Sequence, residues 1–73
     1  MSITPLTAPA PRLLRLPAVL DRVGLGRSRV YELIAEGRFP TPVKLSERAI
    51  AWPSDEVDAW ITERIATRDA EAM

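Results

Sequence analysis

The stretch from Leu16 to Gly37 constrains the fold most, because it has the pattern of two short helices joined by a turn. Gly24 and Gly37 follow the two segments, where a helix commonly ends in a residue with positive φ. Two apolar stripes joined by a turn of about four residues pack against each other, so the stretch predicts a helix-turn-helix. The residues that recur with a helical period are Leu16, Val19, Leu20 and Val23, then Val30, Leu33 and Ile34.

Positive charge is concentrated at the start of the second helix. Gly26 or Ser28 is the expected cap, with Arg27 and Arg29 in the first turn. Two arginines there oppose the helix dipole at a cost of a few tenths of a kcal/mol each, roughly. Free backbone amides and guanidinium groups together bind phosphate. The alternative is that Arg29 pairs with Glu32, three residues further on.

The outward face of the second helix is small and polar. At about 100° per residue, Ser28, Glu32 and Ala35 lie opposite the apolar stripe, and Arg29 and Tyr31 flank them. Such a face can enter a groove of a nucleic acid. Phosphate would repel Glu32 unless that carboxylate accepts a hydrogen bond from cytosine N4 or pairs with an arginine, and the sequence leaves both open.

A small hairpin is predicted next. Pro40 and Pro42 exclude a helix after Gly37. Residues 43–46 and 49–52 then alternate as strands do, which predicts a two-stranded wing with a basic rim or, alternatively, a solvated hairpin that covers the core. Residues expected to point inward are Val43, Leu45, Ile50 and Trp52, and those expected to point outward are Lys44, Ser46 and Arg48.

A final helix completes the predicted domain. Ser54 is the expected cap, and the carboxylates of Asp55 and Glu56 suit the helix dipole. Before the first helix, residues 13–14 form a short strand or extended anchor. The predicted apolar stripe is Val57, Trp60, Ile61 and Ile65, with Trp52 and Trp60 both in the core. Residues 1–11 form a disordered tail, residues 12–66 the domain, and residues 67–73 a frayed tail.

Charge is divided along the chain although its net value is zero. Residues 1–48 carry eight basic and four acidic residues, whereas residues 49–73 carry two basic and six acidic ones. A basic front can meet phosphates, and a basic front with an acidic rear also lets copies attract each other head to tail. The chain has no cysteine and no histidine, which excludes disulfides, thiolate or imidazole metal sites and Ser-His or Cys-His catalytic pairs.

The predicted layout of helix, turn, helix, wing and helix resembles a MerR-like winged helix, a small α+β fold that is mainly α. The amino-acid sequence itself resembles the AlpA family of phage and mobile-element regulators more closely. This resemblance runs from Leu13 to Ile61, about two-thirds of the chain. The matching sequence is LLRLPAVLDRVGLGRSRVYELIAEGRFPTPVKLSERAIAWPSDEVDAWI, and FPTPVKL is its most specific segment. Three positions depart from the family pattern. Gly26 replaces a serine cap, Arg29 a small hydroxyl residue and Glu32 a basic residue.

The resemblance implies sequence-directed binding of double-stranded DNA, in the same broad group as excisionases, with no catalysis, metal or cofactor. The second helix would approach the major groove, and the wing would contact phosphate or the minor groove. The candidate DNA-binding residues are Arg27, Ser28, Arg29, Tyr31 and Glu32 on the helix and Lys44, Ser46 and Arg48 on the wing.

The small size of the domain predicts how the protein acts. One winged helix buries only roughly 600–1,000 Å² on DNA, so we expect cooperative binding to adjacent sites, with copies head to tail and the DNA bent. An integrase or recombinase is a further expected partner. No segment predicts membrane insertion, and the expected location is the bacterial cytoplasm, at the nucleoid. The alternative function is a protein-interaction module, an adaptor or antitoxin, that keeps the fold without binding DNA.

Overall fold

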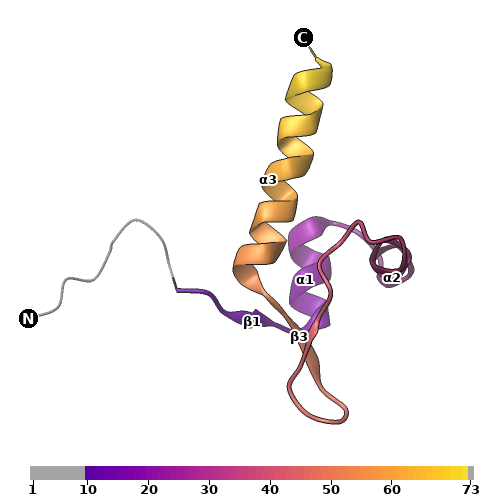
Figure 1. The fold of residues 1–73 in the computed structure, drawn as a ribbon, viewed down its shortest axis with the longest axis vertical. Helices are drawn as coiled ribbons and strands as arrows, with labels where there is room; N and C mark the ends of the chain where they lie inside the picture. Colours follow the sequence, from indigo (N-terminus) through magenta and orange to yellow (C-terminus); the bar gives the residue numbers. More distant parts are fainter. Residues whose placement is uncertain (1–9, 73) are drawn as a thin grey trace, which may run out of the picture.

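The order of elements matches the predicted winged helix-turn-helix, an α+β fold that is mainly helical (Figure 1). A computed structural model describes residues 10–72 of the chain, so most of the tail predicted for residues 1–11 lies outside the described residues. The elements are β1 (Leu13–Leu14), α1 (Leu16–Val23), α2 (Arg27–Ala35), β2 (Val43–Lys44), β3 (Ile50–Pro53) and α3 (Ser54–Glu71).

Glycines end both helices of the helix-turn-helix, as predicted. Gly24 has φ 71° and Gly37 has φ 73°, a conformation that side chains with a Cβ rarely adopt. After α2, the N–H of Gly37 donates to the Ile34 carbonyl at 3.0 Å, and the N–H of Arg38 donates to the Leu33 carbonyl at 2.8 Å. This Schellman arrangement satisfies the last carbonyls of α2 and turns the chain toward the hairpin.

A fully buried tryptophan, Trp52, lies at the centre of the core. Its indole Nε1 donates a hydrogen bond to the Pro40 carbonyl at 2.9 Å, which fixes the loop between α2 and β2. Ile34 was predicted in the core, but it is only partly buried and packs against the buried cluster, as does Leu25 in the turn. The buried apolar cluster around Trp52 also contains Leu14, Val19, Val30, Leu33, Phe39 and Val57.

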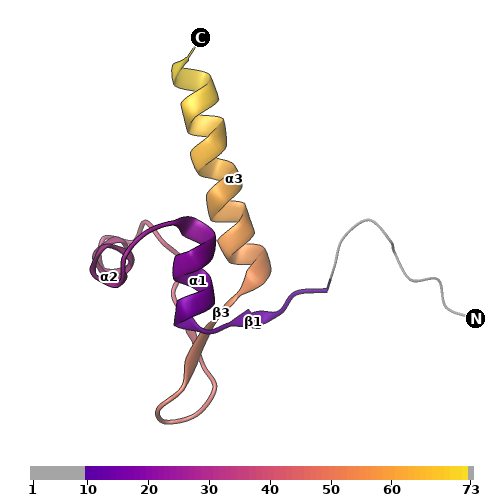
Figure 2. The same cartoon turned by 180° about the vertical axis from the view of Figure 1, so that it is seen from behind.

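The hairpin belongs to a three-stranded antiparallel sheet in the order β1-β3-β2, rather than to an isolated two-stranded wing. Val43 lies opposite Ala51, and Lys44 lies opposite Ile50. Opposed residues share a face of the sheet, so this register places Lys44, not Val43, on the face of Ile50. The predicted inward orientation of Val43 and Leu45 is therefore wrong. These side chains are 40% and 47% exposed, because the hairpin projects beyond the helices (Figure 2).

Ser54 has a role different from the predicted cap of α3. No side chain caps that helix start; instead, the Ser54 hydroxyl accepts the N–H of Arg12 at 2.8 Å. The N–H of Ser54 donates to the Arg12 carbonyl at 2.6 Å. Ser54 thus ties the chain before β1 to the start of α3.

The far half of α3 extends beyond the core (Figure 1). Ile65, predicted in the apolar stripe, is 47% exposed, so that part of the prediction is wrong. The backbone stays helical as far as Glu71, within the segment 67–73 that was predicted to fray. None of the helices in residues 10–72 has the length and apolar character that crossing a bilayer requires.

The two tryptophans should differ in their contribution to stability. Trp52 is fully buried, whereas Trp60 is only partly buried against the core. Trp52→Ala should lower the free energy of unfolding by about 3–5 kcal/mol, against about 4–11 kcal/mol in total for a chain of this size. Trp60→Ala should cost less. Urea denaturation followed by circular dichroism measures both, and an equal or larger loss for Trp60→Ala would contradict this assignment of the core.

Candidate nucleic-acid interface

The start of α2 presents backbone amides without a side-chain cap. Gly26 is the cap residue, so the structure decides between the two predicted candidates, Gly26 and Ser28. Gly26 has no side chain to accept a hydrogen bond from the first amides, which therefore have no partner at the cap residue's side chain. Arg27, Ser28 and Arg29 form the first turn, and all three are exposed. Such a helix start can donate to an anionic oxygen while two guanidinium groups flank it.

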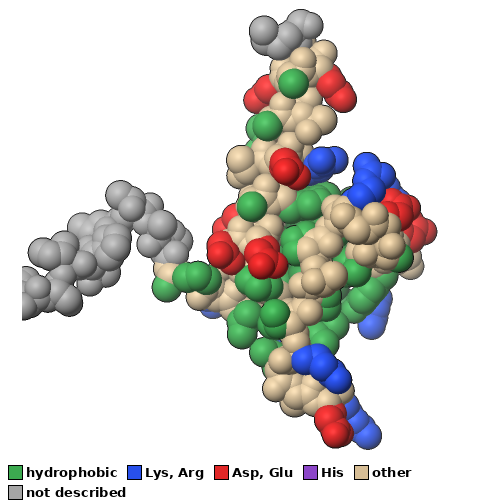
Figure 3. Space-filling model, in the orientation of Figure 1, with side chains coloured by type: hydrophobic (Ala, Val, Ile, Leu, Met, Phe, Trp, Pro, Cys, Tyr) green, Lys and Arg blue, Asp and Glu red, His purple; other side chains and the backbone are tan. Residues whose placement is uncertain are grey.

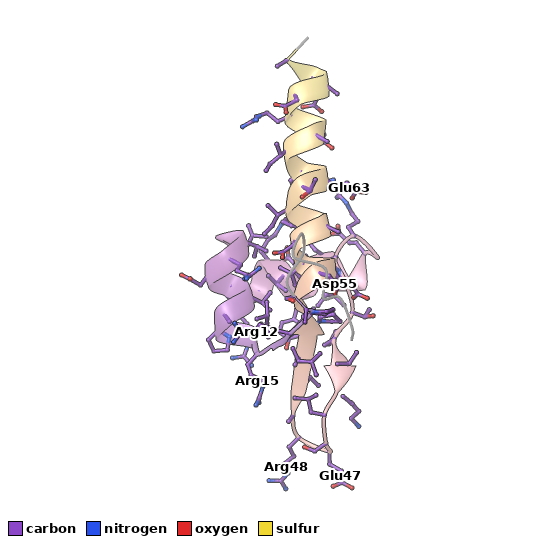
Figure 4. All side chains as sticks on the ribbon, turned by 90° about the vertical axis from the view of Figure 1, so that its left-hand side faces the viewer. Arg12, Arg15, Glu47, Arg48, Asp55 and Glu63 are labelled. Carbon is purple, nitrogen blue, oxygen red and sulfur yellow. The ribbon has the colours of Figure 1, made fainter. Side chains whose placement is uncertain are left out.

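Three elements converge on one depression of about 270 Å³, which we call the arginine depression. The N-terminal end of α1, the outer side of α2 and the hairpin each contribute an arginine. Figure 4 shows Arg15 and Arg48 at the same end of the molecule, away from Asp55 and Glu63. The lining residues are Arg15, Leu16, Pro17, Arg27, Tyr31, Arg48 and Ile50.

The predicted site residues are therefore only partly gathered. Arg27 and Tyr31 of α2 and Arg48 of the hairpin line the arginine depression together. The other candidates are also exposed, but they do not line it: Ser28, Arg29 and Glu32 on α2, and Lys44 and Ser46 on the hairpin.

An ion pair neutralises part of the outward face of α2. The guanidinium of Arg29 donates to the Glu32 carboxylate at 2.9 Å, which is the pairing that the sequence left open. Glu36 pairs in the same way with Arg38 at 3.4 Å. Both pairs are exposed, and exposed pairs contribute only about 0–1 kcal/mol, so a phosphate can replace either carboxylate at little cost.

Arg15 is the residue that sequence reasoning missed. It was counted in the charge of the basic half, but it was not assigned to the site. Arg15 is the cap residue of α1, and its carbonyl accepts the N–H groups of Ala18 and Val19 at 3.0 and 3.1 Å. The pairing of Leu14 with Trp52 places Arg15 beside the base of the hairpin. No local pattern specifies that pairing, so the sequence carried no signal for this position.

Charge is separated in space as well as along the chain. Within residues 10–72, Arg15, Arg27, Lys44 and Arg48 form no ion pair, whereas Arg22 of α1 pairs with Asp58 of α3. Figure 3 shows acidic side chains along α3, and both basic and acidic side chains at the tip of the projecting hairpin, where Figure 4 labels Glu47 beside Arg48. No group of three potential ligands in the described part of the chain could hold a metal ion. The arrangement thus offers cationic side chains and amides to an extended anion.

The family model described as "Prophage CP4-57 regulatory protein (AlpA)" matches residues 12–65. The "Uncharacterized protein ORF88" of Enterobacteria phage P4 is 49% identical over 57 residues, 78% of this chain; the chain spans only 65% of that relative's length. The "DNA-binding transcriptional activator AlpA" of Escherichia coli (strain K12) is 31% identical over 61 residues, 75% of this chain and 87% of the relative. No solved structure matches. The chain belongs to the AlpA family of prophage regulatory proteins.

Proposed function

We propose that this chain is a regulator that binds double-stranded DNA through the face containing the arginine depression. The observation that carries the proposal is the convergence of Arg15, Arg27 and Arg48, none of them in an ion pair within the described residues, on one depression. Each comes from a different element, so together they can follow a phosphate backbone rather than a single anion. The name of the Escherichia coli relative supports the same function.

In this proposal, α2 enters the major groove and the hairpin lies against the backbone. The exposed polar residues Ser28, Arg29 and Glu32 would face base edges. Contact with a base edge would draw Arg29 away from Glu32 and leave that carboxylate free to accept a hydrogen bond from cytosine N4. Lys44, Ser46 and Arg48 of the hairpin would contact phosphate or the minor groove, and Tyr31 would line the contact between helix and backbone.

The size of the domain supports cooperative action. A single module of this kind buries roughly 600–1,000 Å² on DNA, too little for tight and selective binding alone. We therefore propose that several copies bind adjacent sites head to tail, with the acidic side of one copy toward the basic side of the next, and that they bend the DNA. Such an assembly could serve as an excisionase, with an integrase as partner, or as a transcriptional activator. The proposed location is the bacterial nucleoid.

The salt dependence of DNA affinity should report the phosphate contacts. We expect the association constant for duplexes selected from a random library to fall as salt rises, with a slope of log K against log[salt] of about −3 to −4. The slope follows because Arg15, Arg27, Lys44 and Arg48 would each neutralise one phosphate. Fluorescence anisotropy at several salt concentrations measures the slope. A chain that retains no duplex even at low salt would contradict the proposal, and would favour the interaction module that its zero net charge allows.

Arg15→Ala should weaken DNA binding without weakening the fold. The Arg15 side chain is exposed and makes no cap hydrogen bond, so the melting temperature should stay near that of the wild type. Loss of one phosphate contact should reduce the salt slope by about 1 and lower the affinity for all sequences alike. Arg68→Ala is the control for net charge, because Arg68 lies far along α3, where it pairs with Asp69 at 2.7 Å. Equal effects of the two variants would show that Arg15 acts only through net charge.

A further inference from the structure

A second hollow, of about 430 Å³, lies between α3 and the loop that follows α2. It shares no lining residue with the arginine depression. Figure 4 shows Glu63, on its rim, high on α3 and away from Arg15 and Arg48. A molecule in this hollow would therefore leave the proposed DNA face free. We call this second hollow the Trp60 groove. Its apolar floor consists of Phe39, Pro40, Ala59 and Trp60, and Glu56 and Glu63 lie on its rim.

The indole of Trp60 is held in place on the floor of this groove. Its Nε1 donates to the Arg38 carbonyl at 2.8 Å, and the ring meets the Phe39 ring edge to face with 5.1 Å between centroids. The guanidinium carbon of Arg64 lies 5.6 Å from the ring centroid. Trp60 remains partly exposed. A fixed and partly exposed aromatic ring is the usual anchor of a protein interface, because it offers contact area at low entropic cost.

The rim of the groove carries negative charge that nothing in the described part of the chain neutralises. Glu56 and Glu63 are exposed and form no ion pair there. Among the described residues that line the groove, Arg38 is the one basic residue, and it is paired with Glu36, while Arg64 lies over the Trp60 ring rather than on the rim. An apolar floor between free carboxylates favours a ligand that has a cation next to an apolar side chain, because the cation meets the rim while the apolar group covers the ring.

Within residues 10–72, Arg12-Leu13 and Val43-Lys44-Leu45 are exposed segments outside α3 that have a cation next to a large apolar side chain. The large hydrophobic residues that are exposed in residues 10–72 are Leu13, Tyr31, Val43, Leu45 and Ile65. Tyr31 lies in the arginine depression, Val43 and Leu45 lie on the hairpin, and Ile65 lies on the same helix as the groove. Leu13 is the remaining candidate. Its side chain is 53% exposed, and the exposed Arg12 precedes it in the chain. We propose that Arg12 and Leu13 of one copy dock in the Trp60 groove of a second copy.

This contact makes the head-to-tail assembly specific. The two surfaces differ, since β1 is an edge strand and the groove lies between α3 and a loop, so each copy can offer one surface and receive the other. Arg12 would meet Glu56 and Glu63, and Leu13 would cover Trp60. The choice of Arg12-Leu13 over the hairpin rests on the proposed function, which gives the hairpin to DNA, but the contact can be tested without DNA.

Two charge-reversed variants test the contact in the absence of DNA. Arg12→Glu spoils the donor segment and keeps the groove, whereas Glu63→Arg spoils the groove and keeps the donor segment. The hydrogen bonds between Arg12 and Ser54 use only the backbone of Arg12, so they survive the substitution. ¹⁵N-labelled Arg12→Glu is titrated with unlabelled Glu63→Arg to about 1 mM. The labelled variant supplies an intact groove and the unlabelled variant an intact donor segment, so each pair can form one native contact. The indole N–H signal of Trp60 is the readout.

We expect that signal to shift and saturate in the mixture, and to stay unchanged when unlabelled Arg12→Glu is added instead. An unchanged signal in the mixture, or an equal shift in both titrations, would overturn the proposal. So would a wild-type chain whose Trp60 signal does not depend on concentration, because the groove would then belong to a different partner.

A second measurement relates the contact to DNA. On duplexes with two selected sites, each variant should lose about tenfold in cooperativity, and the double variant R12E/E63R should regain it. Affinity for a single site should equal that of the matched controls Arg68→Glu and Glu71→Arg. Unchanged cooperativity in both variants would overturn the proposal. Loss of DNA binding by the wild type, together with a shifted Trp60 signal, would reject the proposed function and support the contact.

Discussion

Burial of Trp52 is the interaction on which the rest of the structure depends. The strand that carries it pairs with β1 on one side and with β2 on the other, and its indole holds the loop after α2 through the Pro40 carbonyl. Val19 of α1 and Val30 of α2 are fully buried in the same cluster. Trp52 therefore joins the sheet and the loop after α2 to a core to which both helices contribute. The distances between Arg15, Arg27 and Arg48 follow from that core, because each arginine lies close to an element that packs on Trp52.

The sequence predicted the elements whose signals are local. The helical period from Leu16 to Ile34 and the positive-φ glycines after each helix were confirmed. The stop imposed by Pro40 and Pro42 and the short strand at Leu13–Leu14 also agree with the structure. Turn chemistry and helix periodicity act within a few residues, so they can be read from one chain. Ser54 shows the limit of such rules. It is a residue type that commonly caps helices and it stands at the start of α3, but its hydroxyl accepts the backbone N–H of Arg12 instead of an amide of the helix.

The candidate site was less predictable because it depends on contacts between distant segments. Alternation in residues 43–52 suggested which side chains point inward, but the register of β2 with β3 is shifted by one residue, which exchanges the two faces of β2. Arg15 entered the site through the pairing of β1 with β3. The ion pair between Arg29 and Glu32 was foreseen only as one of two alternatives. Trp60 has the spacing of a core residue, yet it forms the floor of a groove because no further element within residues 10–72 covers α3 there.

The central claim is that three arginines from separate elements form one surface for a DNA backbone. Side-chain NMR of the ¹⁵N-labelled chain tests it most directly, through the Nε–Hε signals of its arginines during titration with a selected duplex. The account predicts that the signals of Arg15, Arg27 and Arg48 shift together with one binding curve, while that of Arg68, far along α3 and outside the Trp60 groove, stays in place. If the Arg68 signal shifts and those of the arginine depression do not, the duplex binds elsewhere and the account is wrong.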